Sequence, residues 1–145
     1  MIRVKLVESQ EELNQAFTIR EKIFIEELGC EWEETFDRYD QESIHFIAYF
    51  DDRPAGSSRY RKTEKGIRLE RFAAYPEFRG KGVGKRLIQS SLGHIETKVK
   101  SPGLLIYLHA QLDALALYAS YGFYQVGEMF MEANIPHFEM RKQIV

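Results

Sequence analysis

A basic, glycine-rich turn in front of a long amphipathic helix constrains this chain more than any other sequence feature. The turn reads Arg79-Gly80-Lys81-Gly82-Val83-Gly84-Lys85, and it follows a stretch typical of a strand. Apolar residues then recur at helical spacing from 83 to 99, which predicts a helix over 82–98. Glycines can expose successive backbone N–H groups, and a helix N-terminus carries about half a positive charge. The turn therefore predicts a pyrophosphate site.

Two common phosphate-binding motifs do not describe this turn. The nucleotide P-loop requires Ser or Thr directly after its Gly-Lys, but Arg86 follows Gly84-Lys85, so no hydroxyl is placed for Mg²⁺. The dinucleotide motif Gly-x-Gly-x-x-Gly fails on its last spacing. A plain glycine turn with exposed basic residues is the alternative, because short glycine motifs also arise by accident.

The hydrophobic pattern of the rest of the chain predicts an α/β (α+β) fold with a mixed sheet. Ser9, followed three residues later by Glu12, predicts the start of a helix that Gly29 ends. Another helix is predicted over 113–121, and an acidic, aromatic loop with a short helix over 31–42. The predicted strands cover 2–7, 44–50, 55–61, 67–75, 104–108, 123–130 and 137–144, with a loop over 131–136. This order predicts helices on both faces of the sheet, in a single domain over residues 1–145.

Charge and composition argue against several classes of protein. The 145 residues include 20 Lys and Arg against 22 Asp and Glu, a net charge of −2, which argues against nucleic-acid binding. Cys30 is the single cysteine and the four histidines share no ligand spacing, so we expect neither a disulfide nor a metal site. No apolar run approaches the ~20 residues of a membrane span, and residues 1–5 lack a signal-peptide core. We expect a cytoplasmic protein, and a homodimer stays open.

Three blocks of the sequence carry a family resemblance. Residues 79–84 resemble the (Arg/Gln)-x-x-Gly-x-(Gly/Ala) signature of the GCN5-related N-acetyltransferases (GNAT). Residues 69–78 resemble that family's fourth strand and its approach to the turn, and residues 114–123 resemble its second conserved block. Residues 127–137, with His109-Ala110-Gln111, resemble the small bacterial ElaA/YjcF-like subgroup. The resemblance implies a mostly antiparallel, twisted sheet of about six to seven strands with helices on both faces.

The resemblance implies acetyl-CoA as co-substrate and a path for binding it. In the family the pyrophosphate sits on backbone N–H groups of the turn, here those of Lys81, Gly82, Val83, Gly84 and Lys85, with Arg79 and Gly80 beside them. The pantetheine arm would pair with the open strand edge of Phe72, Ala73 and Ala74. Gln111 stands where many members carry an Asn that contacts this arm.

The same resemblance implies transfer of an acetyl group to a primary amine by direct attack in a ternary complex. A backbone N–H near Phe72 would stabilise the thioester carbonyl oxygen. Tyr118 matches the tyrosine that protonates the leaving CoA thiolate, with a core tyrosine as the alternative. Two residues compete as the base that deprotonates the amine, His137 after Pro136 and Glu70 acting through water. Ordered water alone is the third option.

The amine acceptor, a small molecule or a peptide, is described by two opposing signals. Arg20 and Arg71, together with Arg59, suggest a carboxylate or phosphate on the substrate. The acidic segment 31–42, with its aromatic side chains, favours a cationic amine or is simply a charged loop. As a candidate base for the amine, His137 is also predicted to contact the substrate.

Two other classes of function compete with an enzyme. A non-catalytic acyl-CoA-binding or sensing module would keep the turn and lose the acid and the base. Tyr118 and His137 are both present, which favours the enzyme. A protein–protein scaffold would leave the basic turn unexplained.

Overall fold

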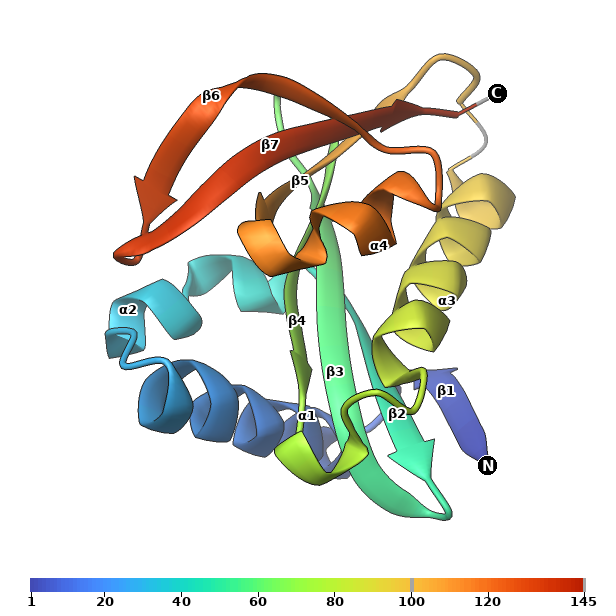
Figure 1. Ribbon diagram of the computed structural model, residues 1–145. Helices are drawn as coiled ribbons and strands as arrows, with labels where there is room; N and C mark the ends of the chain where they lie inside the picture. Colours follow the sequence, from blue (N-terminus) through green and yellow to red (C-terminus); the bar gives the residue numbers. More distant parts are fainter. Residues whose placement is uncertain (100, 145) are drawn as a thin grey trace.

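A seven-stranded sheet forms the centre of the computed structural model, which describes residues 1–99 and 101–144 (Figure 1). The strands are β1 (Ile2–Leu6), β2 (Ile44–Phe50), β3 (Arg53–Lys62), β4 (Ile67–Ala74), β5 (Leu105–Gln111), β6 (Tyr124–Glu132) and β7 (Ile135–Gln143). Their order in the sheet is β1-β2-β3-β4-β5-β7-β6, and neighbours are antiparallel except β4 and β5. The prediction of a mixed, mostly antiparallel sheet is confirmed.

Helices cover both faces of this sheet. They are α1 (Gln10–Arg20), η1 (Glu21–Glu27), α2 (Trp32–Thr35), η2 (Arg38–Gln41), η3 (Pro76–Phe78), α3 (Val83–Lys98), η4 (Leu112–Ala114) and α4 (Leu115–Ala119). Alternate residues of β2 show the two faces, since Phe46 and Ala48 pack in the core with α3, whereas Ile47 and Tyr49 pack with α1. Within the described residues, no helix is long and apolar enough to cross a membrane.

The first helix begins and ends where the sequence predicts, but its second half has a different hydrogen-bond pattern. The Ser9 hydroxyl accepts from the backbone N–H of Glu12 at 3.2 Å, and Gly29 takes a φ of +74° after the last turn. Between them α1 continues into the π-helical segment η1. Phe24 of this segment and Cys30, which follows Gly29, line a cavity between β4 and β5.

The connection between β6 and β7 differs from the sequence prediction of a loop over 131–136. Both strands continue to a two-residue turn, in which Ala133 and Asn134 take φ values of +51° and +62°. Such a turn matches the twist of a hairpin, but the sequence signal was weak because alanine rarely adopts positive φ. His137 consequently lies inside β7, opposite Gln111 of β5 and Phe130 of β6, and not at the start of a strand.

The parallel pair β4 and β5 is joined over a very short length. Ile67 pairs with Ile106 and Arg68 with Tyr107, and no further pair of these strands is formed in the described part of the chain. Beside this junction, a Cβ on Gly66 would lie 2.2 Å from the carbonyl oxygen of Leu105, so only glycine fits. From Leu69 onward the edge of β4 is open, and the two strands leave a gap in the sheet.

Candidate active site

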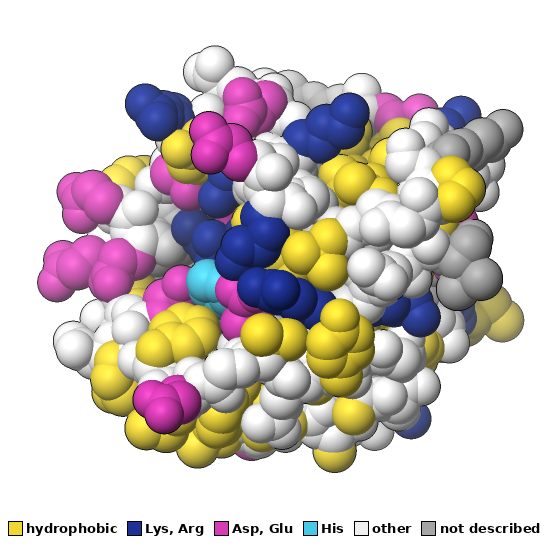
Figure 2. Space-filling model, turned by 90° about the horizontal axis from the view of Figure 1, so that it is seen from above, with side chains coloured by type: hydrophobic (Ala, Val, Ile, Leu, Met, Phe, Trp, Pro, Cys, Tyr) yellow, Lys and Arg dark blue, Asp and Glu magenta, His cyan; other side chains and the backbone are white. Residues whose placement is uncertain are grey.

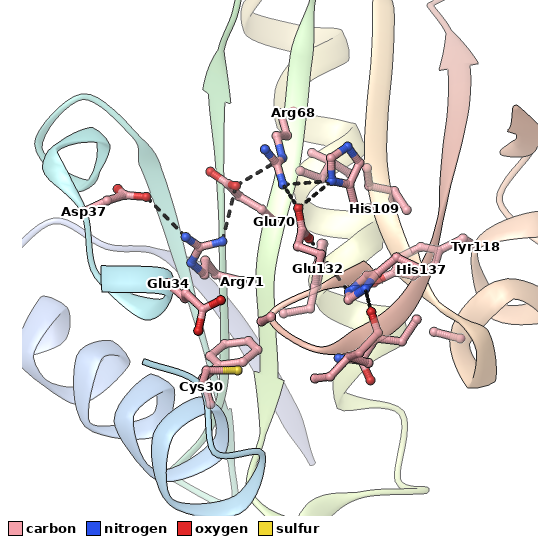
Figure 3. A pocket seen from close by; sticks show the side chains of 18 of the residues that line it. Cys30, Glu34, Asp37, Arg68, Glu70, Arg71, His109, Tyr118, Glu132 and His137 are labelled. Carbon is pink, nitrogen blue, oxygen red and sulfur yellow. Dashed lines mark hydrogen bonds and ion pairs between the residues drawn. The ribbon is translucent and has the colours of Figure 1, made fainter. Parts of the chain in front are cut away.

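A cavity of about 510 Å³ occupies this gap between β4 and β5. Leu69, Leu108 and Tyr118 of the α3-side core line it, and so do the charged side chains of β4 that face the other side of the sheet. The cavity therefore reaches both faces through the gap. Seen from above, basic and acidic side chains surround a histidine in the hollow (Figure 2), and the close view shows the labelled side chains pointing into it (Figure 3).

Glu70 lies at the centre of a group of arginines on the α1 side of the cavity. Its carboxylate accepts hydrogen bonds from Arg59 at 2.6 and 2.9 Å and from Arg61 at 2.7 Å, and Arg68 and Arg71 lie 3.1 and 3.4 Å away. Burial raises the pKa of Glu70, but the surrounding arginine charges outweigh it and hold the pKa below its ordinary value. A carboxylate in this state is a poor proton acceptor.

Arg20 does not lie where the prediction of a substrate contact requires. Its side chain is 1% exposed and pairs with Asp40 at 2.7 Å, and it is absent from the cavity lining. Arg59 is equally buried and binds Asp37 and Asp40. We correct the prediction for Arg20: a buried arginine needs a carboxylate partner, and here that partner is internal.

Arg71 lines the cavity and is held firmly in place, and its predicted contact with the substrate stays a prediction. Its guanidinium donates to the carbonyl oxygen of Thr35 at 3.1 Å and to Asp37 at 3.2 Å. Its φ of +61° marks a bulge in β4, between the pairs Arg59–Glu70 and Ser57–Ala73. The bulge turns the edge of β4 at the point where the strand opens.

His137 reaches the cavity with one ring nitrogen available. Its Nδ1 lies 2.6 Å from the carbonyl oxygen of Ile135, so this nitrogen carries the hydrogen and donates it. The ring stacks on Phe130 with centroids 6.0 Å apart. In the neutral ring the lone pair is then on Nε2, which lies 3.8 Å from the Glu132 carboxylate.

Glu132 and His109 are residues that sequence reasoning missed. The Glu132 carboxylate lies 2.9 Å from His109 Nδ1 and 3.4 Å from Arg68 Nη2. Burial raises the pKa of Glu132, but the hydrogen bond and charge of His109 and the charges of Arg68 and His137 lower it to about 2. These side chains come from four different strands, so only the register of the short β6–β7 turn could have revealed the group.

Tyr118 lies at the other side of the same cavity. Its ring is buried and packs edge-on against Phe72 at 5.9 Å and Phe123 at 6.2 Å. Burial, with the carboxylate of Asp113, raises the pKa of Tyr118 above its ordinary value, so the hydroxyl keeps its proton at neutral pH. Phe72 and Gln111 also line the cavity.

The glycine-rich turn lies beyond the cavity, where the open edge of β4 leads. Gly80 and Gly82 have φ values of +76° and +93°, and no side chain of the described residues caps the α3 N-terminus. Gly84 is different, because a Cβ there would meet only Leu117, at 3.9 Å. The protein's own packing does not require this glycine, which leaves room for a group that approaches the helix closely.

Charged side chains flank the turn without filling it. Arg79 pairs with Glu27 at 2.8 Å, and the ammonium of Lys81 lies 5.1 Å from the centre of the Phe50 ring. The bare helix N-terminus and the room at Gly84 fit a pyrophosphate. Among the residues that the structure describes, no three His, Cys, Asp or Glu side chains form a metal-binding group.

The parted strands, the turn and the cavity between them define an acyl-group transferase of mixed α/β fold. A sequence model of the acetyltransferase (GNAT) domain matches residues 8–144, and the chain belongs to this family, whose members use acyl-CoA. It is 30% identical to the uncharacterized N-acetyltransferase YjcF of Bacillus subtilis, over 97% of this chain and 99% of that one. Protein ElaA of Escherichia coli is 25% identical over 94% of this chain and 91% of the relative. The family resemblance is confirmed.

Solved structures agree with this family assignment. The crystal structure of Escherichia coli ElaA has a TM-score of 0.86 at 23% identity, covering 98% of this chain and 99% of that chain. An acyl-CoA N-acyltransferase from Pseudomonas aeruginosa has a TM-score of 0.79 at 25% identity, covering 98% of each. The expected GNAT-type fold is therefore confirmed.

Proposed function

We propose that this protein transfers an acetyl group from acetyl-CoA to a primary amine of a small molecule or peptide, by direct attack while both substrates are bound. One observation carries the proposal: a single cavity brings together the free Nε2 of His137 and the protonated hydroxyl of Tyr118. The cavity lies on the open edge of β4, which leads to the bare N-terminus of α3.

In this proposal His137 removes the proton from the attacking amine. Its Nδ1–H is anchored on Ile135, which fixes the ring and leaves Nε2 as the proton acceptor. Glu132, 3.8 Å from Nε2, stabilises the positive ring that results. Glu70 is the weaker candidate, because four guanidinium groups would oppose its protonation.

Tyr118 donates a proton to the sulfur that leaves. Burial keeps the hydroxyl protonated, so a proton is present for this role. Acetyl-CoA supplies the acetyl group as a thioester. We assign its pyrophosphate to the backbone N–H groups from Lys81 to Lys85, and its pantetheine arm to the open edge at Phe72, Ala73 and Ala74. Gln111 borders the same space.

The test combines two measurements on the purified protein. A thiol reagent follows CoA release with acetyl-CoA and a panel of amines, and calorimetry follows acetyl-CoA binding. Release with at least one amine supports the enzyme. Binding of acetyl-CoA without release for any amine supports the alternative, a non-catalytic acyl-CoA-binding or sensing module.

A substitution at the proposed base refines the test. His137→Asn should lower turnover by roughly 10²-fold or more while acetyl-CoA affinity stays, because the ring lies in the cavity and away from the turn. His94→Asn is the matched control, since His94 lies on α3 and does not line the cavity. Unchanged turnover in His137→Asn would assign the proton to Glu70 or to ordered water.

A further inference from the structure

A buried charged cluster beside the cavity, on the α1 face of the sheet, holds more guanidinium groups than carboxylates. Five arginines share three carboxylates in this cluster: Arg20, Arg59, Arg61, Arg68 and Arg71, with Asp37, Asp40 and Glu70. Each of the three carboxylates contacts at least two arginines, so none is left to bind a cation. Glu132 is similarly engaged by Arg68 and His109. Within this cluster the unused hydrogen-bonding capacity is on the arginines. Glu34 and Asp113 also line the cavity, and neither forms an ion pair with a described residue.

Arg61 has the largest unused capacity. Its Nε donates to Glu70 at 2.7 Å, but its two terminal amino groups have no hydrogen-bond acceptor among residues 1–99 and 101–144. The guanidinium lies over the ring of Tyr39, with its central carbon 4.0 Å from the ring centre, and the side chain is 13% exposed. Stacking on Tyr39 holds the planar group in one orientation, which prepares it to bind a planar anion.

Arg68 faces the same space from the neighbouring strand. It pairs directly with Arg61 across the β3–β4 ladder, so the two side chains lie side by side on one face. Its Nε is buried 3.1 Å from the Glu70 carboxylate, and its Nη2 lies 3.4 Å from Glu132 and 3.1 Å from His109 Nδ1, whereas its Nη1 has no hydrogen-bond partner in the described chain. Two like charges placed side by side, with donors unused, favour an anion between them.

We propose that Arg61 and Arg68 form a subsite for a carboxylate of the acceptor, which makes the substrate an amine that also carries a carboxylate, such as an amino acid. This inference rests on the proposed function and names its substrate class. Glu132 shows how far apart Arg68 and His137 are, since its one carboxylate lies 3.4 Å from Arg68 and 3.8 Å from His137. A carboxylate at Arg68 and an amine at His137 are thus about one short side chain apart. A phosphate, with its second negative charge, would be repelled more by Glu132 and Asp37.

Matched acceptors test the subsite. The rate of CoA release is measured with an α-amino acid, its carboxamide, its decarboxylated amine, a short ω-amino acid and an aminoalkyl phosphonate. We expect kcat/KM for a carboxylate-bearing amine to exceed that of its neutral partner by at least about tenfold, because a neutral group leaves the arginine donors unpaired. Preference for the phosphonate, or for the neutral amines, overturns the proposal.

Variants assign the preference to the arginines. In Arg61→Gln the ratio of kcat/KM between the carboxylate-bearing and neutral amines should fall toward one, and Arg61→Lys should keep part of it. Arg38→Gln is the matched control, since Arg38 also stacks on Tyr39 but does not line the cavity. Should Arg61→Gln fail to fold, the same ratio measured in Arg61→Lys decides. A ratio that is unchanged in both variants overturns the subsite.

A binding measurement separates this inference from the proposed function. Calorimetry in the presence of CoA compares the amino acid with its carboxamide in the parent protein and in Arg61→Gln. Carboxylate-dependent binding that needs Arg61, with no CoA release for any amine, refutes the proposed reaction and supports the subsite. Release that is equal for charged and neutral amines supports the reaction and refutes the subsite. Equal binding of the amino acid and its carboxamide also refutes the subsite.

Discussion

The two faces of the sheet differ in the chemistry of their buried side chains at β3 and β4, although the same strands form both. The α3 face is apolar, with Leu69, Leu87 and Ile106 all about 1% exposed. The α1 face has a smaller apolar core, and beside it Arg20, Arg59 and Glu70 are buried as charges. An apolar face can be assembled from side chains of approximately the right size, whereas buried charges are tolerated only in a defined arrangement. We therefore expect the free energy of unfolding to depend on the ion pairs of the α1 face. On the α3 face, we expect substitutions beside the cavity to change activity with little effect on stability.

The largest expected effect is on turnover, at the apolar edge of the cavity. Tyr118→Phe keeps the packing against Phe72 and removes only the hydroxyl, so turnover should fall by roughly 10²–10⁴-fold with stability and acetyl-CoA affinity retained. Steady-state kinetics measures the turnover, thermal unfolding the stability and calorimetry the acetyl-CoA affinity. Tyr121→Phe, on the same segment, is the control. Equal turnover in the parent and Tyr118→Phe would make Tyr118 a packing residue.

The next effect is on stability, on the charged face. Arg59→Leu leaves Asp37, Asp40 and Glu70 without their shared partner, and should cost about 3–5 kcal/mol in the free energy of unfolding. Urea unfolding measures it. Arg3→Leu, which removes an exposed pair at 3.9 Å, should change stability by less than about 1 kcal/mol. If both substitutions cost the same, the pairing is not what stabilises the α1 face.

The turn offers a binding change without a stability change. Gly84→Asp places a negative charge where the pyrophosphate is expected, and acetyl-CoA affinity should fall by at least about 10²-fold. The same carboxylate favours the helix N-terminus, so the variant should stay folded. Gly93→Asp, exposed in the middle of α3 with nothing within 4 Å, is the control for the added charge. Undiminished affinity in folded Gly84→Asp would move the cofactor away from the turn.

The smallest effect is the response of the charged face to acid. Burial raises the pKa of Asp37, but the hydrogen bonds and charge of Arg59 and the charge of Arg71 lower it to about 2, below the ordinary ~3.9 of an unfolded chain. Solvent screening reduces the stabilisation to about 1 kcal/mol, which is present above about pH 4 and is lost as the pH falls toward 2. Unfolding free energies from pH 6 to 2 should show a shallower decline in Asp37→Asn than in the parent. Asp52→Asn should follow the parent, and an unaltered slope in Asp37→Asn would contradict the pairing.

Local patterns explain which parts of this fold could be predicted. Strand alternation, the Ser9 cap and the glycine turn act over a few residues, and the elements they predict lie within a few residues of the observed bounds. Tyr118, His137, Phe72 and Gln111 meet at one cavity, as the family resemblance suggested. The role of each in the reaction stays a prediction.

Long-range register explains what could not be predicted. The pairing of Arg20 with Asp40 joins α1 to η2, and the contact of Glu132 with His109 depends on the turn at Ala133. No local pattern specifies such contacts. The positive φ of Arg71 is equally hidden, because arginine gives no signal for a bulge.

The short junction between β4 and β5 has a consequence for how the molecule comes apart. Only two residue pairs in the described chain join β1–β4 to β5–β7. The sheet therefore consists of two antiparallel ribbons, one of four strands and one of three, held together by a short parallel junction. Separating the ribbons would break few backbone hydrogen bonds. Successive N–H groups of a strand point to opposite neighbours, so of Ile106 and Tyr107 only the amide that faces β4 should exchange at a lower free energy than global unfolding, whereas the amide that faces β7 stays protected. A side chain at Gly66 would collide with Leu105 beside this junction, and should push β4 and β5 apart where the gap between them begins.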